Sequence, residues 1–409
     1  MGERAIALAF TARFTDEVLS GAWTVLAPTF RVVFGLSLVQ VGLLAQVVEW
    51  VALLVEPVTA AMIDLWSRRR LISGGALALA VSLAAMAGAG SYGWLLVAFA
   101  AYGVGSGPLC HTADIVVVES FPAAPERAYA RATFLDTAGA FFGPGLIAGA
   151  LALHVSWRPV LLALAGGAAL YAALASVTEF PPPPRVRHPD RRLVAEVASG
   201  LRAAVAHPGV RRALTVLLCF DLFESAFVLK YIWLHDQVGL SLPVVALWAT
   251  VEQGVDLVAL GLLDRWLGRR PAATAFRMAA SALVVLPAAW VLAPGVAGRV
   301  MLGIPLAFAR ILIWPLAKAD SLTADAELAG AAQAVTALFP VIPFALLQSR
   351  FAEALGIGPA LAVTGAIGAA AMLVASREGR RGRGGPARRA RRLRRPGSPR
   401  GGPARRSRE

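Results

Sequence analysis

Residues 38–70 read LVQVGLLAQVVEWVALLVEPVTAAMIDLWSRRR. The part up to Ile63 is almost wholly apolar, and a run of that length crosses a hydrocarbon core of about 30 Å as an α-helix. Lipid offers no hydrogen-bond partners, so a crossing segment must be a helix or part of a closed barrel, and an uninterrupted apolar run excludes the barrel. The stretch therefore predicts a membrane-spanning helix that ends in a short charged loop from Asp64 to Arg70.

Similar apolar runs fill most of the chain on both sides of this one. The 409 residues are 57% hydrophobic, and their mean hydropathy is +0.66, which is above what a soluble domain of this length carries. The runs predict an all-α integral membrane protein with about twelve transmembrane helices. The predicted spans are 6–30, 38–63, 71–90, 94–118, 131–154, 159–177, 212–234, 242–263, 273–293, 299–319, 330–349 and 357–376.

Most of the positive charge lies in one tail. The net charge is +14, and the segment 377–409 holds fourteen arginines against two glutamates. An Arg-, Gly- and Pro-rich segment without apolar spacing is predicted to be disordered, and we expect it to contact anionic lipid headgroups on the cytoplasmic side. Nucleic acid is not an expected partner. Cys110 and Cys219 fall inside apolar spans, so neither a disulfide nor a metal site is expected, and no cofactor is predicted.

The loops that carry arginine set the predicted orientation. Basic clusters at 68–70, 127–131 and 265–270 fall on the same side of the membrane as the tail. Such residues favour the cytoplasm. We therefore predict a multi-pass protein of the cytoplasmic (inner) membrane with both termini cytoplasmic.

One long linker divides the spans into two sets. Residues 178–211 contain a Pro-rich segment followed by Leu193, Val197, Leu201 and Val205, a spacing of four that predicts an amphipathic helix on the cytoplasmic membrane face. The predicted organisation is an N-terminal six-helix bundle over 1–177, this linker, a C-terminal six-helix bundle over 212–376, and the tail over 377–409.

The two halves repeat at an interval of about 200 residues. Asp64 with Arg68 and Arg69 corresponds to Asp264 with Arg265, Arg269 and Arg270. Glu56 and Asp256 each stand eight residues before the aspartate, Glu119 corresponds to Asp320, and Pro144 to Pro343. Parallel six-helix halves are typical of transporters that bind substrate between the halves.

The loop after the second span resembles the signature of the major facilitator superfamily, Gly-x-x-x-Asp-Arg-x-Gly-Arg-Arg. Asp64, Arg68 and Arg69 match it, and the second copy runs from Gly261 to Arg270. The resemblance implies two pseudo-symmetric six-helix bundles. It also implies that the charged residues of both loops form a conformational charge lock between the halves. Simple positive-inside anchoring is the alternative.

The fifth span resembles the antiporter motif of drug-efflux branches of that superfamily. It carries Gly139, Gly143, Pro144 and Gly149, whereas Phe99 replaces the arginine that those branches have in the fourth span. Glycines permit close approach of helix backbones, and Pro144 removes a hydrogen-bond donor. We expect close helix packing here, and the resemblance implies a role in restricting leakage.

Charged side chains inside the spans are the candidate functional residues. Each unpaired charge at membrane depth costs about 3 kcal/mol, so these side chains must face a cavity, form pairs or be protonated. The predicted substrate and proton cavity comprises Asp16, Glu17, Glu49, Glu56, Asp221, Glu224, Glu252, Asp256 and Arg310.

Local pairing is the alternative for several of these residues. Arg13 is three and four residues from Asp16 and Glu17, so the three side chains could form a salt bridge within one helix. Arg310 could serve only to neutralise a neighbouring acid. Asp114 and Glu119 are expected to be structural, and His111 to be a packed histidine.

Because acids outnumber bases among these residues, we predict a secondary active transporter that uses alternating access for proton-coupled efflux of a cationic or amphipathic compound. The expected partners are the lipid bilayer, a small-molecule substrate and protons, and the expected state is a monomer. An importer or uniporter of a small metabolite, or a non-transporting sensor, are the alternatives. No enzyme motif is found, so no enzymatic activity is predicted.

Overall fold

The computed structural model describes residues 3–63, 66–121, 125–180, 199, 201–225, 227–267, 271–323, 335 and 338–382. The described part is helical throughout and contains no strand. Nine of its helices are long and apolar enough to cross a membrane. The predicted all-α architecture with helices of membrane-spanning length is confirmed.

The first bundle comprises seven helices. They are α1 (Glu3–Val25), α2 (Ala27–Phe34), α3 (Leu38–Ile63), α4 (Arg68–Gly88), α5 (Tyr92–Ser120), α6 (Pro125–Ala152) and α7 (Trp157–Val177). α1 packs against α5 and α6, and α4 packs against α5 and α7. About half of the apolar core cluster comes from these helices.

The second bundle begins after the linker. Its elements are α9 (Pro208–Glu224), α10 (Phe227–Asp236), α11 (Leu242–Leu267), α12 (Ala272–Leu292), α13 (Gly295–Thr323), the 3-10 turn η2 (Phe339–Val341), α15 (Phe344–Leu355) and α16 (Ile357–Gly382). α16 packs against α9 and α12, and α13 packs against α9, α11 and α12. The linker residues 181–198 and 200 and the tail residues 383–409 lie outside the described part, so the predicted interfacial helix and disordered tail stay predictions.

The structure divides three predicted spans in two. The span 6–30 turns at Leu26, before Pro28. The span 212–234 breaks after Glu224, and the described part of the span 330–349 contains η2 and then α15, with Pro340 and Pro343 around the break. Proline has no backbone N–H, so it cannot continue the hydrogen-bond ladder of a helix, which accounts for the first and third breaks but not for the second, where no proline lies in the span. Apolar composition alone did not reveal these breaks.

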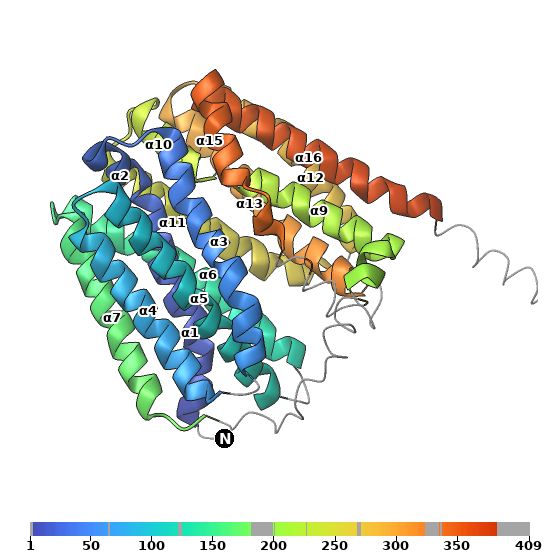
Figure 1. The fold of residues 1–409 in the computed structure, drawn as a ribbon. Coiled ribbons are helices and arrows are strands. Elements are labelled where there is room, and N and C mark those ends of the chain that lie inside the picture. The colour runs from blue at the N-terminus through green and yellow to red at the C-terminus, as the bar shows by residue number, and fades with distance from the viewer. Residues whose placement is uncertain are drawn as a thin grey trace, which may run out of the picture.

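The main contacts between the two bundles are those of α6 with α11, α3 with α15, and α2 with α10 (Figure 1). We call the end where the chain leaves α7 for α9 the linker end, and the opposite end, which carries α2 and α10, the far end. Figure 1 shows the bundles meeting at the far end and diverging toward the linker end.

Candidate functional site

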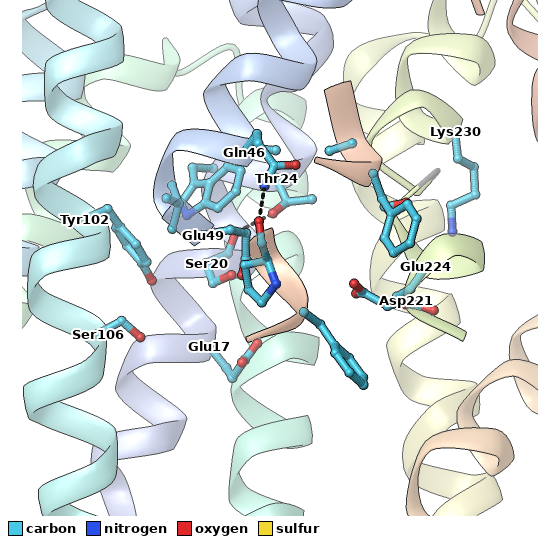
Figure 2. Close-up of a pocket in the computed structure, with 18 of the residues that line it drawn as sticks. Glu17, Ser20, Thr24, Gln46, Glu49, Tyr102, Ser106, Asp221, Glu224 and Lys230 are labelled. Atoms are coloured by element: carbon cyan, nitrogen blue, oxygen red, sulfur yellow. Dashed lines mark hydrogen bonds between the residues drawn. The ribbon is translucent and has the colours of Figure 1, made fainter. Parts of the chain in front are cut away.

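A cavity of about 600 Å³ lies between the two bundles. Its wall comes from α1, α3 and α5 on one side and from α9, α10, α11, α13 and residues 339–345 on the other. This volume falls in the range of small-molecule pockets, roughly 300–1,000 Å³. Figure 2 shows Glu17 and Glu49 on one side of the cavity, and Asp221, Glu224 and Lys230 on the other. We call this cavity the chamber.

Contacts between the bundles close the chamber at the far end. Arg31 of α2 forms an ion pair with Asp236 of α10, and the Glu353 side chain accepts a hydrogen bond from the Val39 backbone N–H at 3.0 Å. α3 approaches α15 so closely at Gly42 that an added Cβ would lie 2.8 Å from the Ser349 Cβ. The structure is therefore sealed at the far end.

Asp16 is the most enclosed carboxylate of the first bundle that lines the chamber. Its side chain accepts hydrogen bonds from the Tyr102 hydroxyl at 3.1 Å, the Ser106 hydroxyl at 2.8 Å and the Cys110 thiol at 3.5 Å. The three donors are spaced four residues apart, so they lie on one face of α5. They orient Asp16 without supplying a positive charge.

Arg13 forms no ion pair with Asp16 or Glu17. Its guanidinium pairs instead with Asp114 of α5 at 2.6 Å and with Asp136 of α6 at 3.4 Å. The alternative of a salt bridge within α1 is therefore wrong. Within the described residues, Glu17, Glu49 and Asp221 form no side-chain ion pair or hydrogen bond. Three carboxylates of the chamber thus have no ion pair or hydrogen-bond donor in the described structure, and Asp16 has donors but no ion pair.

The basic residues of the chamber are already paired. Arg310 donates to Glu224 and to Asp256, and the Lys230 Nζ lies 2.5 Å from the Glu252 Oε2. Lys230 and Glu252 are almost wholly buried, as is Asp256. These pairs lie within the second bundle, so they leave the acidic surplus of the chamber unbalanced.

Six of the nine predicted cavity residues line the chamber: Asp16, Glu17, Glu49, Asp221, Glu224 and Arg310. The other three lie outside its lining. Glu252 and Asp256 face Lys230 and Arg310 inside the second bundle, and Glu56 lies 3.3 Å from His111 between α3 and α5. Residue spacing predicted that Glu252 and Asp256 lie on one face of their helix, but it did not predict which side chains that face contacts.

The sequence interpretation assigned no role to several lining residues. The spacing of four between Tyr102, Ser106 and Cys110 could have shown that they share one helix face. The role of Lys230 follows only from its ion pair with Glu252, which the sequence does not reveal. Buried Gln348 donates to the Leu222 carbonyl and, at 2.9 Å, to the Ser225 hydroxyl. It thereby satisfies polar groups at the break between α9 and α10. Such irregular backbone is tolerated at membrane depth where it lines a cavity.

The predicted charge lock is only partly described. Arg68 is buried and pairs with Glu119 of α5 at 2.5 and 2.9 Å, within its own bundle. Arg69 and Arg265 are exposed, whereas Asp64, Arg269, Arg270 and the side chain of Asp264 lie outside the described part. A lock between the bundles stays a prediction.

The glycines of the fifth span pack against α1. A Cβ at Gly139 or Gly143 would overlap the carbonyl oxygen of Phe14 or Val18, and a Cβ at Gly21 would lie 2.8 Å from the Pro144 Cδ. Gly149 has nothing within 4 Å. Three of the four motif residues therefore contact one helix of the same bundle.

Two bundles around a charged chamber that is closed at one end define a membrane-spanning carrier. The chain belongs to the major facilitator superfamily, whose family model matches residues 5–319. The predicted family is thus confirmed, and membership indicates a transporter rather than an enzyme. None of the curated proteins matches the chain in sequence.

Solved transporter structures share the fold. A bacterial homolog of the human lysosomal transporter Spinster, in an inward-facing and unoccupied conformation, is 18% identical with a TM-score of 0.63, over 91% of this chain and 92% of that chain. The nucleoside transporter NupG is 12% identical with a TM-score of 0.69, over 91% and 97%. A POT family transporter in complex with a thioalcohol-conjugated peptide is 13% identical with a TM-score of 0.70, over 91% and 95%. At these identities the likeness is one of fold alone.

Proposed function

We propose that this protein exports a cationic or amphipathic compound across the cytoplasmic membrane by proton-coupled alternating access. The observation that carries the proposal is the acidic surplus of the chamber. Glu17, Glu49 and Asp221 line it without an ion pair in the described structure, whereas Lys230 and Arg310 are each held by carboxylates of the second bundle. Unpaired carboxylates at membrane depth favour binding of a cation, which can be a substrate or a proton.

The lining also suits an organic cation better than a metal ion. Trp23, Tyr102 and Trp314 lie in the wall of the chamber, and aromatic faces attract organic cations. Among the described residues, no group of three or more His, Cys, Asp or Glu side chains could hold a metal ion. The carboxylates are spread along a chamber rather than gathered around a point.

Orientation follows from the charged loops. The linker end carries the arginines at 68–70, and such residues favour the cytoplasm. The described state would then receive a compound from the cytoplasm, because its far end is sealed by Arg31 and Asp236. One proton moving through 100 mV supplies about 2.3 kcal/mol, enough for roughly a fifty-fold gradient.

Flux measurements in proteoliposomes test the proposal. We expect transport of ethidium, used as a probe cation, to depend on an imposed pH gradient. Asp16→Asn should abolish that dependence, and Glu49→Gln or Asp221→Asn should reduce ethidium transport at least several-fold. Glu179→Gln is the matched control, because Glu179 is an exposed acid near the linker end.

Two results would contradict the proposal. Ethidium transport that does not depend on the pH gradient would contradict the proposed proton coupling. Unchanged ethidium transport by all three chamber variants would show that these carboxylates are not the transport site. Specific ethidium binding without any flux would instead support the sensor alternative.

A further inference from the structure

The short helix α10 touches both the chamber and the far-end seal. Lys230 lines the chamber, and Asp236, six residues further along the same helix, pairs with Arg31 of the other bundle. Six residues of α-helix span about 9 Å. A movement of α10 that displaces Lys230 therefore also displaces one partner of the seal.

α10 is a separate short helix, because α9 ends before the turn at Ser225. In the last turn of α9 the Ser225 N–H donates to the Asp221 carbonyl at 2.9 Å. In the same turn the side chain of Gln348 donates to the Leu222 carbonyl and to the Ser225 hydroxyl. A hinge held by side-chain hydrogen bonds can turn without breaking a continuous helix, because each such bond contributes only about 1 kcal/mol net.

One buried ion pair ties α10 to its neighbour on the chamber side. Lys230 Nζ lies 2.5 Å from the carboxylate of Glu252 on α11, and the two side chains are only 4% and 8% exposed. α11 also packs against α6 of the other bundle, where Gly254 faces Phe141. The pair therefore holds a hinged helix to a helix that is packed into the interface between the bundles.

We propose that Lys230 and Glu252 are positioning residues that couple the charge in the chamber to the far-end seal. A cation that enters the chamber repels the ammonium of Lys230 and weakens its attachment to Glu252. α10 then turns about its break, Asp236 separates from Arg31, and the far end opens. The response to a cation rests on the proposed function, whereas the mechanical role of the pair does not.

The test measures the distance between the bundles at the far end of the full chain. Spin labels on Ser91→Cys and Leu292→Cys, both exposed and in opposite bundles, report it by pulsed electron paramagnetic resonance in a Cys110→Ser, Cys219→Ser background. Neutralising both partners, with Lys230→Met and Glu252→Gln, should shift the open-to-closed ratio without ligand by about tenfold or more. The exchanged pair Lys230→Glu with Glu252→Lys should keep the far end closed.

Arg13→Gln with Asp114→Asn is the matched control, because it neutralises an ion pair of the first bundle that has no contact with α10. An unchanged distance in the neutral Lys230 and Glu252 variant would overturn the inference, as would opening in the exchanged pair or in the control. Should the neutral variant fail to fold, Glu252→Asp, which shortens the carboxylate arm, must open the far end in part.

Measurements with added ethidium distinguish the proposed transport of a cation from the proposed coupling role of Lys230 and Glu252. Ethidium should lengthen the far-end distance in the unmodified pair and have little further effect in the neutral variant. Opening of the neutral variant without any response of the unmodified pair to ethidium would reject the cation as substrate but leave the coupling role intact.

Discussion

At the scale of single residues, each bundle buries one arginine between two acids. Arg13 pairs with Asp114 and Asp136 in the first bundle. In the second, Arg310 pairs with Glu224 and Asp256. The carboxylates of the spans that have no ion pair or hydrogen-bond donor in the described structure, Glu17, Glu49 and Asp221, line the chamber instead.

Replacement of Arg310 tests whether its ion pairs with Glu224 and Asp256 stabilise the second bundle. Arg310→Gln should lower the free energy of unfolding by about 3–5 kcal/mol, because it leaves the carboxylates of Glu224 and Asp256 without their shared cation. Arg310→Lys should recover little, since an ammonium cannot present the two-sided guanidinium fork. Thermal unfolding of the purified protein in detergent measures both. Adding Asp256→Asn to Arg310→Gln should restore part of the loss, and no restoration would contradict the assigned pairing.

At the scale of helices, glycines serve two kinds of contact. Gly139 and Gly143 bring α6 against α1 within one bundle. Gly42 brings α3 against α15 between the bundles, where an added Cβ would lie 2.8 Å from the Ser349 Cβ and 2.9 Å from the Ala345 carbonyl oxygen. The first contact lies within one bundle, and the second joins the two bundles at the far end.

A methyl group at the first kind of contact should destabilise the fold. We expect Gly139→Ala and Gly143→Ala each to cost about 1–3 kcal/mol, the usual penalty of overpacking. Gly149→Ala is the control, because nothing lies within 4 Å of its Cβ position. Thermal unfolding distinguishes them, and equal melting temperatures for all three variants would show that α6 does not depend on this packing.

A methyl group at the second kind of contact should change the conformation rather than the stability of the bundles. Gly42→Ala is expected to favour the far-end-open state, because the clash with α15 disappears when the bundles part. Spin labels at positions 91 and 292 report the shift, with Gly74→Ala as the control since Gly74 has no neighbour within 4 Å. An unchanged far-end distance in Gly42→Ala would mean that α3 and α15 accommodate the methyl group in the sealed state.

At the scale of the whole molecule, the proposed orientation assigns the two ends of the bundles to opposite sides of the membrane. A cysteine at Ser91, at the far end, should react with a membrane-impermeant maleimide in intact cells. A cysteine at Glu179, next to the end of α7, should react only after the cells are permeabilised. The opposite pattern would reverse the orientation, and with it the direction proposed for transport.

The amino-acid sequence by itself determined which segments enter the membrane and which family they belong to. The span predicted over 38–63 has the same bounds as α3, because the length and polarity of a segment decide whether it crosses lipid. The cost of an unpaired charge at membrane depth also directed attention to the right residues, since six of the nine predicted cavity residues line the chamber.

Only the tertiary structure decided which charges meet. Arg13 bypasses the acids of its own helix for Asp114, 101 residues away, and Glu252 turns to Lys230 instead of the chamber. Helical periodicity specifies the face on which a side chain lies, but the packing of several helices specifies what lies opposite that face. The breaks in the spans 212–234 and 330–349 depend on the same packing, because Gln348 donates to the Leu222 carbonyl at the first and Gln46 of α3 donates to the Pro340 carbonyl at the second.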